Sequence, residues 1–302
     1  MIRLIALLLL LGTAQAVGCQ VTPKATVPLD MMHGVPTLQL LVDGQPARFV
    51  LDTGAGRTTV SVAAVRRLGL SLNKWIGTTV EGIGGLQRHQ DASPQSMVLA
   101  GLSLHQTGLG APLSLAVAAL PFSNQRPGSE IDGLLGRDLL GSSDLDLDLQ
   151  HLRLTLFSVT DCQADFVPWK HPYGTVPTIP AYRQDLVFLA ELDSRPMRTM
   201  IDSGAGISFL TASGTVRAQL PPLAPGRDAA ARVAGVGPRR LIARLHRFDT
   251  LSVAGITTSS PALVVSDVHL SPLLDMLLGV DWLRTHRVWL SFATRQVFVA
   301  GR

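Results

Sequence analysis

The sequence predicts an all-β protein made of two similar lobes, and three observations lead to this prediction. The chain of 302 residues is 46% hydrophobic and 16% charged, with 28 Gly and 19 Pro, which is typical of a globular protein rich in strands and tight turns. It repeats a unit of about 120 residues. Within each unit the apolar residues follow the patterns of strands, and signals for helices are scarce.

The duplication is visible in two pairs of segments. Residues 42–56, VDGQPARFVLDTGAG, align with residues 192–206, LDSRPMRTMIDSGAG, and seven of the fifteen positions are identical. Residues 131–140, IDGLLGRDLL, align with residues 274–283, LDMLLGVDWL, and six of the ten positions are identical. A unit of this length is too long for a solenoid repeat and suits a small domain.

Each unit is predicted to begin with a β-hairpin. Residues 36–42 and 46–51 are apolar-rich runs joined by Asp43-Gly44, a strong turn signal, and residues 186–192 and 196–201 repeat the pattern. Further strands are expected where Leu and Asp alternate over residues 144–149, with one face in water, and in a second-half hairpin. That hairpin spans residues 287–292 and 296–300. The few helical signals are Val62, Val65 and Leu68, then Leu139-Leu140, and then Trp282-Leu283.

Residues 1–18 are predicted to be an export signal. Arg3 precedes an apolar run from Leu4 to Leu11, and Ala14-Gln15-Ala16 has the small-x-small pattern of a cleavage site. The run is too short to span a bilayer. We therefore expect an exported, periplasmic protein.

Two fates of Cys19 remain open at this point. Ala16-Val17-Gly18-Cys19 resembles a bacterial lipobox, which would acylate Cys19 and tether the protein to the outer membrane. Alternatively Cys19 pairs with Cys162, the only other cysteine, in an oxidising periplasm. The protein would contact a membrane only through the lipid of an acylated Cys19.

The tripeptides Asp52-Thr53-Gly54 and Asp202-Ser203-Gly204 are the candidate site. Each follows a run of apolar strand residues and precedes Ala-Gly, at equivalent positions of the duplicated unit. A single Asp-Thr-Gly would be read as a turn. One such tripeptide at the same position of each unit indicates a site to which each lobe contributes one carboxylate.

Both units resemble the retropepsin-like aspartic peptidases, in which an apolar strand ends in Asp-Thr/Ser-Gly-Ala. A Gly-rich flap and an apolar-apolar-Gly segment then follow in that family. The resemblance implies two retropepsin-like β-barrel lobes related by a pseudo-two-fold axis, with the active-site cleft between them. We place the lobes at residues 27–158 and 181–302, with a linker at 159–180.

The resemblance also implies residue roles. Asp52 and Asp202 are the catalytic pair, and Thr53, Gly54, Ser203 and Gly204 support their loops. The flaps that bind substrate correspond to Gly82, Ile83, Gly84 and Gly85 in the first unit and to Gly235, Val236 and Gly237 in the second. Pro238 replaces Gly85 in the second flap.

The chemistry of two adjacent carboxyl groups supports this assignment. Hydrolysis of an amide without a metal needs a base that activates water and an acid for the carbonyl oxygen. Two carboxyl groups about 3 Å apart cannot both ionise, so the pair offers one base and one acid. Because Ala55 and Ala205 lack a hydroxyl that could donate to the carboxylates, we expect the highest turnover at about pH 5 to 7.

Other chemistries find little support in the sequence. Motifs for nucleotides, metals or a serine nucleophile are absent and the eight His are dispersed, so no metal or cofactor is expected. No aromatic residues alternate with Arg239, Arg240, Arg244 and Arg247, so these are interpreted as a solvated face and nucleic acid is not expected as a partner. The repeat also pairs Asp132 with Asp275 and Asp138 with Asp281, for which we expect capping or surface roles.

The sequence therefore predicts a monomeric aspartic endopeptidase that acts on a peptide or protein substrate. The alternative is an inactive peptide-binding or envelope scaffold protein of the same fold, because a fold does not prove activity.

Overall fold

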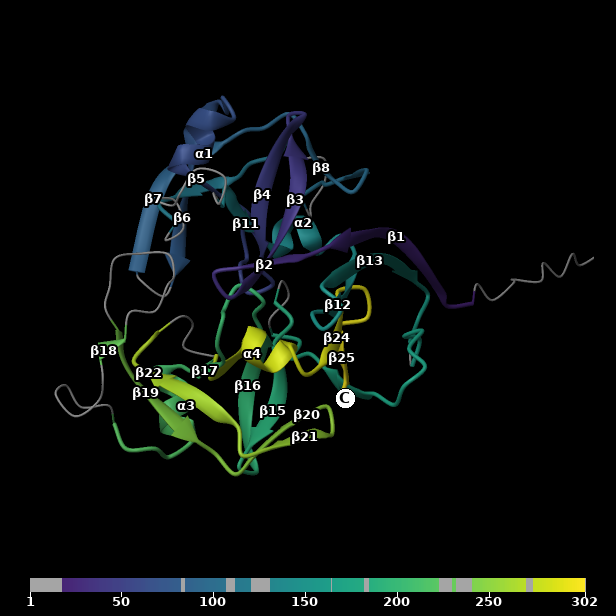
Figure 1. The fold of residues 1–302 in the computed structure, drawn as a ribbon, viewed down its shortest axis with the longest axis vertical. Helices are drawn as coiled ribbons and strands as arrows, with labels where there is room; N and C mark the ends of the chain where they lie inside the picture. Colours follow the sequence, from purple (N-terminus) through teal and green to yellow (C-terminus); the bar gives the residue numbers. More distant parts are fainter. Residues whose placement is uncertain are drawn as a thin grey trace, which may run out of the picture.

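The computed structural model describes residues 18–82, 85–106, 112–120, 131–163, 165–181, 185–222, 230–231, 241–269 and 274–301. Strands dominate and form two lobes joined by a sheet that both halves of the chain share (Figure 1). The predicted all-β fold of two lobes is confirmed.

The N-terminal lobe, purple and blue in Figure 1, is built on an eight-stranded sheet. The strand order is β10-β5-β11-β4-β3-β8-β9, and β2 also pairs with β3. Asp43 and Gly44 form the turn between β3 and β4 with φ of 49° and 77°, as an Asp-Gly hairpin requires. The strands are β2 (Asp30–Met32), β3 (Val35–Val42), β4 (Gln45–Leu51), β5 (Thr59–Ser61), β8 (Met97–Leu99), β9 (Leu102–Ser103), β10 (Ala116–Ala118) and β11 (Gly133–Leu135).

The C-terminal lobe repeats this arrangement in a nine-stranded sheet, in the order β18-β19-β22-β17-β23-β16-β15-β20-β21. Asp193 and Ser194 form the turn between β15 and β16, again with positive φ. The strands are β15 (Phe188–Leu192), β16 (Arg195–Ile201), β17 (Phe209–Leu210), β18 (Ala230–Ala231), β19 (Leu241–Arg247), β20 (Thr250–Val253), β21 (Ile256–Ser259), β22 (Ala262–Ser266) and β23 (Met276–Leu278).

A six-stranded sheet, in the order β1-β13-β12-β24-β25-β14, joins the two halves. At its centre β12 pairs antiparallel with β24, so that Leu145 lies opposite Leu290 and Leu147 opposite Val288. The predicted hairpin of residues 287–300 is confirmed as β24 and β25. The strands are β1 (Gln20–Pro28), β12 (Asp144–Asp148), β13 (Arg153–Thr160), β14 (Gly174–Pro177), β24 (Arg287–Ser291) and β25 (Gln296–Ala300).

The strand bounds bear on the predicted domain limits without deciding them. β13 crosses the expected end of the first lobe at residue 158, and β14 lies inside the expected linker, where it pairs with β25. The assignment of residues 27–158, 159–180 and 181–302 to lobes and linker stays a prediction.

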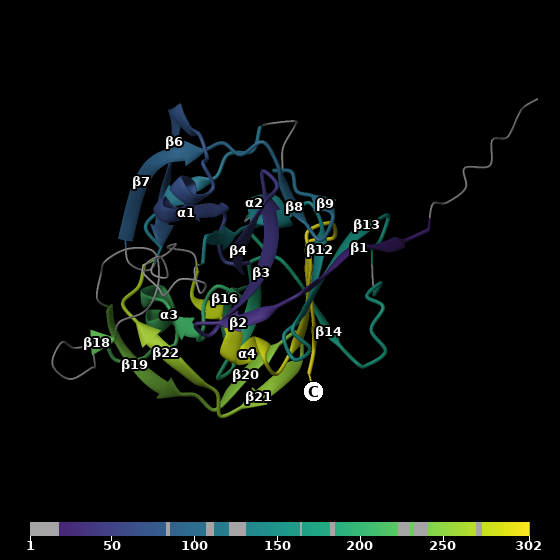
Figure 2. The same ribbon diagram turned by 45° about the horizontal axis from the view of Figure 1, so that its top comes forward.

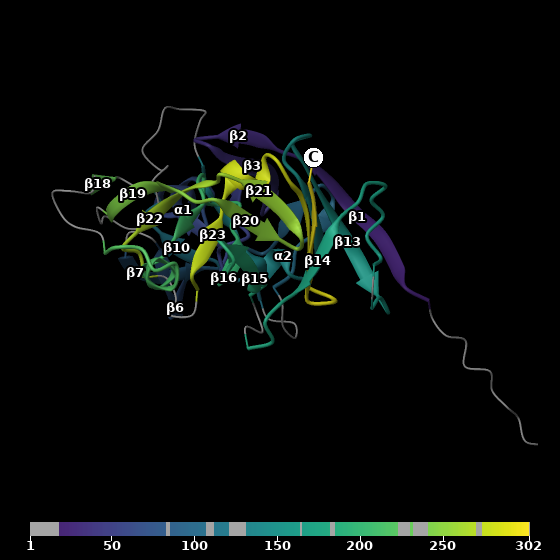
Figure 3. The same ribbon diagram turned by 90° about the horizontal axis from the view of Figure 1, so that it is seen from below.

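A separate two-stranded ribbon rises from the N-terminal lobe. It consists of β6 (Leu72–Gly82) and β7 (Gly85–Ala92), which pair up to Gly82 opposite Gly85. The views in Figures 1, 2 and 3 place the ribbon on the side of the molecule where β18 and β19 lie, away from β1, β13 and β14. The register shifts between Leu72 and Gly77, so β6 carries a bulge near the base of the ribbon.

Among the described residues there are four helices, all short: α1 (Val62–Arg67), α2 (Arg137–Leu140), α3 (Ala212–Arg217) and α4 (Val280–Leu283). The oxygen of the N-cap residue Ser61 accepts the Ala64 N–H at 3.0 Å, and that of Thr211 accepts the Gly214 N–H at 3.2 Å. The apolar patterns predicted α1, α2 and α4. They missed α3, whose sequence ASGTVR has no apolar stripe and several weak helix formers.

The expectation that the aspartates of β12 face water was wrong. Asp144, Asp146 and Asp148 are all buried. Asp144 accepts the indole N–H of Trp289 at 3.0 Å, and Asp146 is paired with Arg287. Side chains from the expected linker complete the cover: they form an aromatic cluster with β13, β24 and β25 that contains Phe157, Phe166, Trp169, Tyr173, Trp289 and Phe298.

Cys19 and Cys162 form a disulfide. They flank the paired strands β1 and β13, whose register places Gln20 opposite Thr160. Of the two fates left open for Cys19, the structure contains this one. Within the described ranges, no helix has the length and apolar character needed to cross a membrane.

Candidate active site

Asp52 and Asp202 each follow the end of a buried strand, β4 and β16. The apolar-apolar-Gly segments, Leu134-Leu135-Gly136 and Leu277-Leu278-Gly279, are the third motif of each unit after the tripeptide and the flap. Each supplies a strand parallel to the one that carries the aspartate: β11 beside β4 and β23 beside β16. The Asp52 N–H donates to the Leu135 carbonyl at 3.1 Å, and the Asp202 N–H donates to the Leu278 carbonyl at 2.9 Å. The two duplicated motifs therefore meet in space and fix where each aspartate leaves its sheet.

The glycine of each tripeptide lies against the carboxyl group of the other lobe. A Cβ atom on Gly54 would lie 2.3 Å from Cγ of Asp202, and one on Gly204 would lie 2.4 Å from Cγ of Asp52. Neither approach leaves room for a side chain. Only glycine at both positions lets the two loops come this close, which explains the pattern that the sequence shows twice.

Each carboxylate is held by its own loop. Oδ1 of Asp52 accepts the N–H groups of Gly54 and Ala55 at 3.0 and 2.8 Å. Oδ1 of Asp202 accepts the N–H groups of Gly204 and Ala205 at 2.9 and 3.1 Å. The two carboxyl groups are also hydrogen-bonded to each other.

The hydroxyl residues join the two loops across the pseudo-two-fold axis. Oγ1 of Thr53 donates to the Ile201 carbonyl at 2.8 Å and accepts the Ser203 N–H at 3.0 Å. Oγ of Ser203 donates to the Leu51 carbonyl at 2.6 Å and accepts the Thr53 N–H at 3.1 Å. Both residues are buried, so these four bonds satisfy groups that water cannot reach.

Burial raises the pKa of both carboxyl groups. At Asp202 burial is the largest cause and the negative charge of Asp52 the second, and together they raise the pKa to about 8. At Asp52 burial also raises the pKa, against the Ala55 N–H and the charge of Arg137, which lower it. The two carboxyl groups titrate as one coupled pair, and the raised pKa of Asp202 keeps one proton on the pair up to about pH 8, so that it holds one acid beside one base.

Arg137 is a buried cation beside this pair, and only the N-terminal lobe has it. Its Nη1 donates to the Thr53 carbonyl at 2.6 Å, and its Nη2 is paired with Asp185. Its charge lowers the pKa of both aspartates. The duplicated position in the C-terminal lobe is Val280.

The third motif supports each loop from behind. A Cβ atom on Gly136 would lie 2.9 Å from the Ala55 carbonyl oxygen, and one on Gly279 would lie 2.6 Å from that of Ala205. Asp138 accepts the N–H and hydroxyl of Thr58 at 2.7 and 2.6 Å. Asp281 binds Ser208 in the same way.

The capping or surface roles expected for the rival carboxylates were wrong for Asp132 and Asp275. Both are buried and paired with arginines, Asp132 with Arg67 and Asp275 with Arg198 and Arg217. Asp138 and Asp281 accept hydrogen bonds from the loop that follows each tripeptide. They do not cap their own helices, because the N-cap positions are occupied by Gly136 and Gly279.

Of the predicted flap residues, Gly82 and Gly85 lie at the described end of the β6–β7 ribbon. Ile83, Gly84, Gly235, Val236 and Gly237 lie outside the described residues. Arg239 and Arg240 do as well, whereas Arg244 and Arg247 bond to the carbonyls of Pro221 and Ser260. In the described part of the chain, no three His, Cys, Asp or Glu residues gather as metal ligands.

Sequence reasoning missed Arg137 and Asp91 as residues near this site. Arg137 lies in the duplicated segment 131–140. The signal that could have found it is that the repeat has Val280, a residue of different character, at the equivalent position. Asp91 had no local signal, because its partners Arg57, Thr78 and Ser114 come from distant parts of the sequence.

Two β lobes that bring Asp-Thr-Gly and Asp-Ser-Gly loops face to face define an aspartic-proteinase-like class of protein. A family model described as aspartyl protease matches residues 38–139 and 189–282, which is more than half of the 302 residues. The chain belongs to the aspartyl protease family.

The solved structures agree on the fold. The crystal structure of aspartic proteinase from Irpex lacteus is similar, with a TM-score of 0.54 and 11% sequence identity over 92% of this chain and 97% of that chain. At this identity the likeness shows the fold alone. No match was found among curated proteins.

Proposed function

We propose that the protein is an aspartic endopeptidase in which Asp52 and Asp202 hydrolyse peptide bonds. The observation that carries the proposal is the mutual approach of the two loops, in which each carboxyl group occupies the space that a side chain on the other lobe's glycine would fill. This arrangement supports a pair that shares one proton, because two carboxylates so close together resist double ionisation.

The proposed mechanism uses the pair as base and acid at once. The ionised carboxylate takes a proton from a water molecule, which attacks the carbonyl carbon of the peptide, while the protonated carboxyl donates to the carbonyl oxygen. Since the charge of Asp52 raises the pKa of Asp202, we assign the base to Asp52 and the acid to Asp202 in the free enzyme. The C–N bond then breaks as the leaving nitrogen takes up the proton gained by Asp52, while one hydroxyl of the tetrahedral intermediate returns a proton to Asp202 and the C=O bond reforms.

Substrate binding is assigned to the β6–β7 ribbon and to the corresponding segment of the second unit. An extended peptide would pair with the backbone of the ribbon as an added strand. We further propose that the active form is a monomer, because one chain supplies both aspartates. Activity per mole should then be unchanged by dilution, and an obligate dimer whose activity vanishes on dilution would contradict this.

We also propose that the protein is exported to the periplasm after cleavage behind Ala16. The disulfide supports export, because such bonds form in oxidising compartments. A sulfur in a disulfide carries no lipid, so the proposed mature form is unlipidated. The intact mass of the protein purified from periplasm would show cleavage, a disulfide and no acyl chain; an acylated Cys19 would contradict this.

The test of function is incubation of the protein, purified after export, with a diverse peptide library from pH 3 to 8, with and without pepstatin. We expect cleavage that pepstatin inhibits and that Asp52→Asn abolishes. Peptide binding without cleavage at any pH would instead favour the inactive scaffold.

A further inference from the structure

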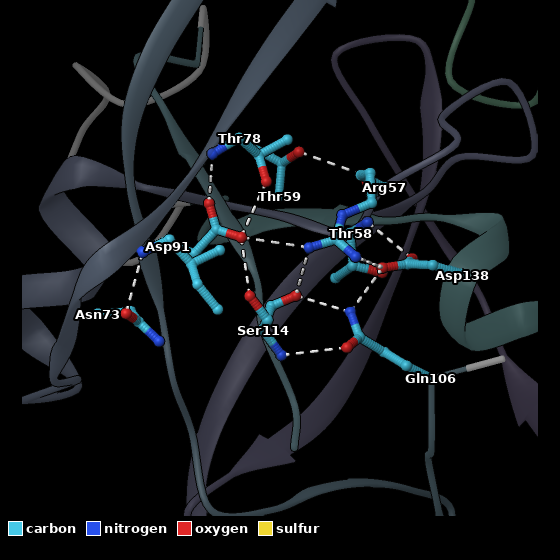
Figure 4. Close-up of polar contacts among 10 residues, drawn as sticks. Arg57, Thr58, Thr59, Asn73, Thr78, Asp91, Gln106, Ser114 and Asp138 are labelled. Atoms are coloured by element: carbon cyan, nitrogen blue, oxygen red, sulfur yellow. Dashed lines mark hydrogen bonds and ion pairs between the residues drawn. The ribbon is translucent and has the colours of Figure 1, made fainter. Parts of the chain in front are cut away.

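Asp91 is a buried carboxylate that the proposed chemistry does not use. It lies on β7, and its side chain has no exposed surface. Oδ1 accepts the Thr78 N–H at 2.7 Å, and Oδ2 accepts the hydroxyls of Thr78 and Ser114 at 2.8 and 2.7 Å. Nη2 of Arg57 completes the set at 3.2 Å from Oδ2 (Figure 4).

These partners belong to different parts of the lobe. Asp91 lies on β7 opposite the bulge of β6, and Thr78 lies on β6 just beyond that bulge. Arg57 lies five residues beyond Asp52 on the loop of the candidate site. The network therefore ties the base of the ribbon to the loop that positions one of the two aspartates.

Arg57 also reaches the support of that loop. The same Nη2 donates to the Ser114 carbonyl at 3.1 Å, and Nη1 lies 3.9 Å from Oδ2 of Asp138. Asp138 is the residue that binds Thr58. Figure 4 shows Arg57 between the two carboxylates.

The carboxylate of Asp91 is buried while Arg57 is partly exposed. Burying a carboxylate is costly even when an arginine pairs with it, so apolar residues of the same size would serve stability as well. The best-supported use of such a pair is to fix one arrangement among several. The position equivalent to Arg57 in the C-terminal lobe is Ile207, so the duplicated unit does not need an arginine here in order to fold.

We propose that Asp91 and Arg57 are positioning residues that hold the β6–β7 ribbon in place against the Asp52 loop, so that its backbone is preformed for a peptide substrate. This inference rests on the proposed peptidase function. A ribbon that is preformed pays no ordering cost when the peptide binds, and one released from the loop must be ordered by each substrate molecule.

The test is Arg57→Gln, with Arg67→Gln as its matched control. The side chains of both arginines are 39% exposed, and both pair with a buried carboxylate of the same lobe. Arg67 binds Asp132, which accepts the Arg48 N–H on β4 and not a group of the ribbon. Arg57→Lys keeps the charge and should behave between wild type and Arg57→Gln.

Peptide cleavage gives the first readout. We expect Arg57→Gln to raise KM about tenfold, as the loss of a hydrogen bond to a charged group does, with kcat changed less than about twofold. Arg67→Gln should leave KM unchanged. General loss of folded protein would instead lower kcat at constant KM in both variants.

Hydrogen exchange of the whole protein gives a second readout that does not need activity. Amides of residues 72–92 should exchange faster in Arg57→Gln than in wild type, while those of residues 36–51 should not. Arg67→Gln should leave the exchange of residues 72–92 unchanged.

Each other result would overturn the inference. An Arg57→Gln protein with unchanged KM or unchanged exchange in the ribbon would show that the network does not position it, and equal effects of the two variants would show general loosening of the lobe. If wild type cleaves no peptide, the proposed function fails, and the substrate role fails with it. In that case, amides of residues 72–92 that exchange as slowly in Arg57→Gln as in wild type would also reject the proposal that Arg57 anchors the ribbon.

Discussion

The two lobes contribute the same groups to the candidate site and differ in the charged residues that lie behind those groups. Both supply an aspartate, a hydroxyl and a glycine with matching hydrogen bonds. Behind these groups the N-terminal lobe has Arg57 and Arg137, and the C-terminal lobe has Ile207 and Val280 at the duplicated positions. Shared geometry is needed to pair the carboxyl groups, whereas one cation is enough to influence both.

A second comparison shows what both lobes need in order to fold. Asp132 and Asp275, equivalent in the repeat, each accept a backbone N–H from the strand that leads to the site and pair with an arginine of the following helix, Arg67 or Arg217. These pairs tie strand, third motif and helix together in both lobes. Outside the proposed catalytic pair, a charged residue found in both copies is therefore interpreted as part of the scaffold, and one found in a single copy as a specialisation.

The sharpest test of the symmetry is the pair of variants Asp52→Asn and Asp202→Asn. Each removes one half of the acid and base pair, so we expect each to lower kcat by about a hundredfold to ten-thousandfold. Steady-state kinetics on protein shown to be folded by circular dichroism would measure this. Near-normal turnover in either variant would mean that the two lobes do not contribute equally.

The next largest effect concerns the edges of the shared sheet. β1 is held to β13 by strand pairing and by the disulfide, whereas β14, at the opposite edge, pairs with β25 without such a bond. The bond closes a loop with a sequence separation of 143 residues, and its loss should cost about 3 to 5 kcal/mol of unfolding free energy.

The measurement is urea unfolding of the double variant Cys19→Ser/Cys162→Ser. Wild type with a reductant should match it, and the variant should not respond to the reductant. A loss below about 1 kcal/mol would show that pairing of β1 with β13 suffices without the bond.

Arg137→Met tests whether one cation serves both lobes. The charge of Arg137 lowers the pKa of Asp52 and of Asp202, so without it both pKa values rise. We expect both limbs of the pH profile of kcat/KM to move to higher pH. The upper limb starts from about pH 8, where the last proton leaves the pair.

Asp185→Asn is the control for that variant. It removes the partner of Arg137 and leaves the cation in place, so the profile should not move to higher pH. A shift of the same sign in both variants would indicate loosening of the loop and not a loss of charge.

The smallest expected effect comes from Ala55→Thr and Ala205→Thr. A hydroxyl that donates to the ionised carboxylate lowers its pKa, so the double variant should move the pH profile about one unit toward acid. Comparing the two single variants would show which lobe sets the lower limb of the pH profile and which sets the upper limb. A wild-type optimum below about pH 4, or a profile that does not move, would contradict our interpretation of these alanines.

The repeat and its motifs predicted the parts of the fold that depend on local pattern. The hairpins of β3 with β4 and of β15 with β16 follow from turn residues and apolar runs, and the pairing of Asp52 with Asp202 follows from their equivalent places in the two units. The structure places the predicted hydroxyls and glycines at contacts that their small size or their oxygen explains.

What the sequence did not predict depends on contacts between distant segments. The alternation of Leu and Asp in β12 was read correctly as a strand, but its polar face is covered because Arg287, Trp289 and the segment before β14 pack there. No pattern within β12 indicates that cover. The three residues that bind the Asp91 side chain, Arg57, Thr78 and Ser114, also come from other segments. Helix α3 forms on weak helix formers because Thr211 caps it and β16 and β22 pack against it.

The disulfide turns residues 19 to 162 into a covalent ring that encloses the N-terminal lobe. A single cut of the backbone inside this ring releases no fragment, since both new ends remain attached through the sulfur atoms. A cut beyond Cys162 frees a piece that only the sheets hold in place. If the proposed peptidase cleaves its own copies, the first lobe therefore stays in one piece after a single nick, and it can be severed there only when the bond is reduced.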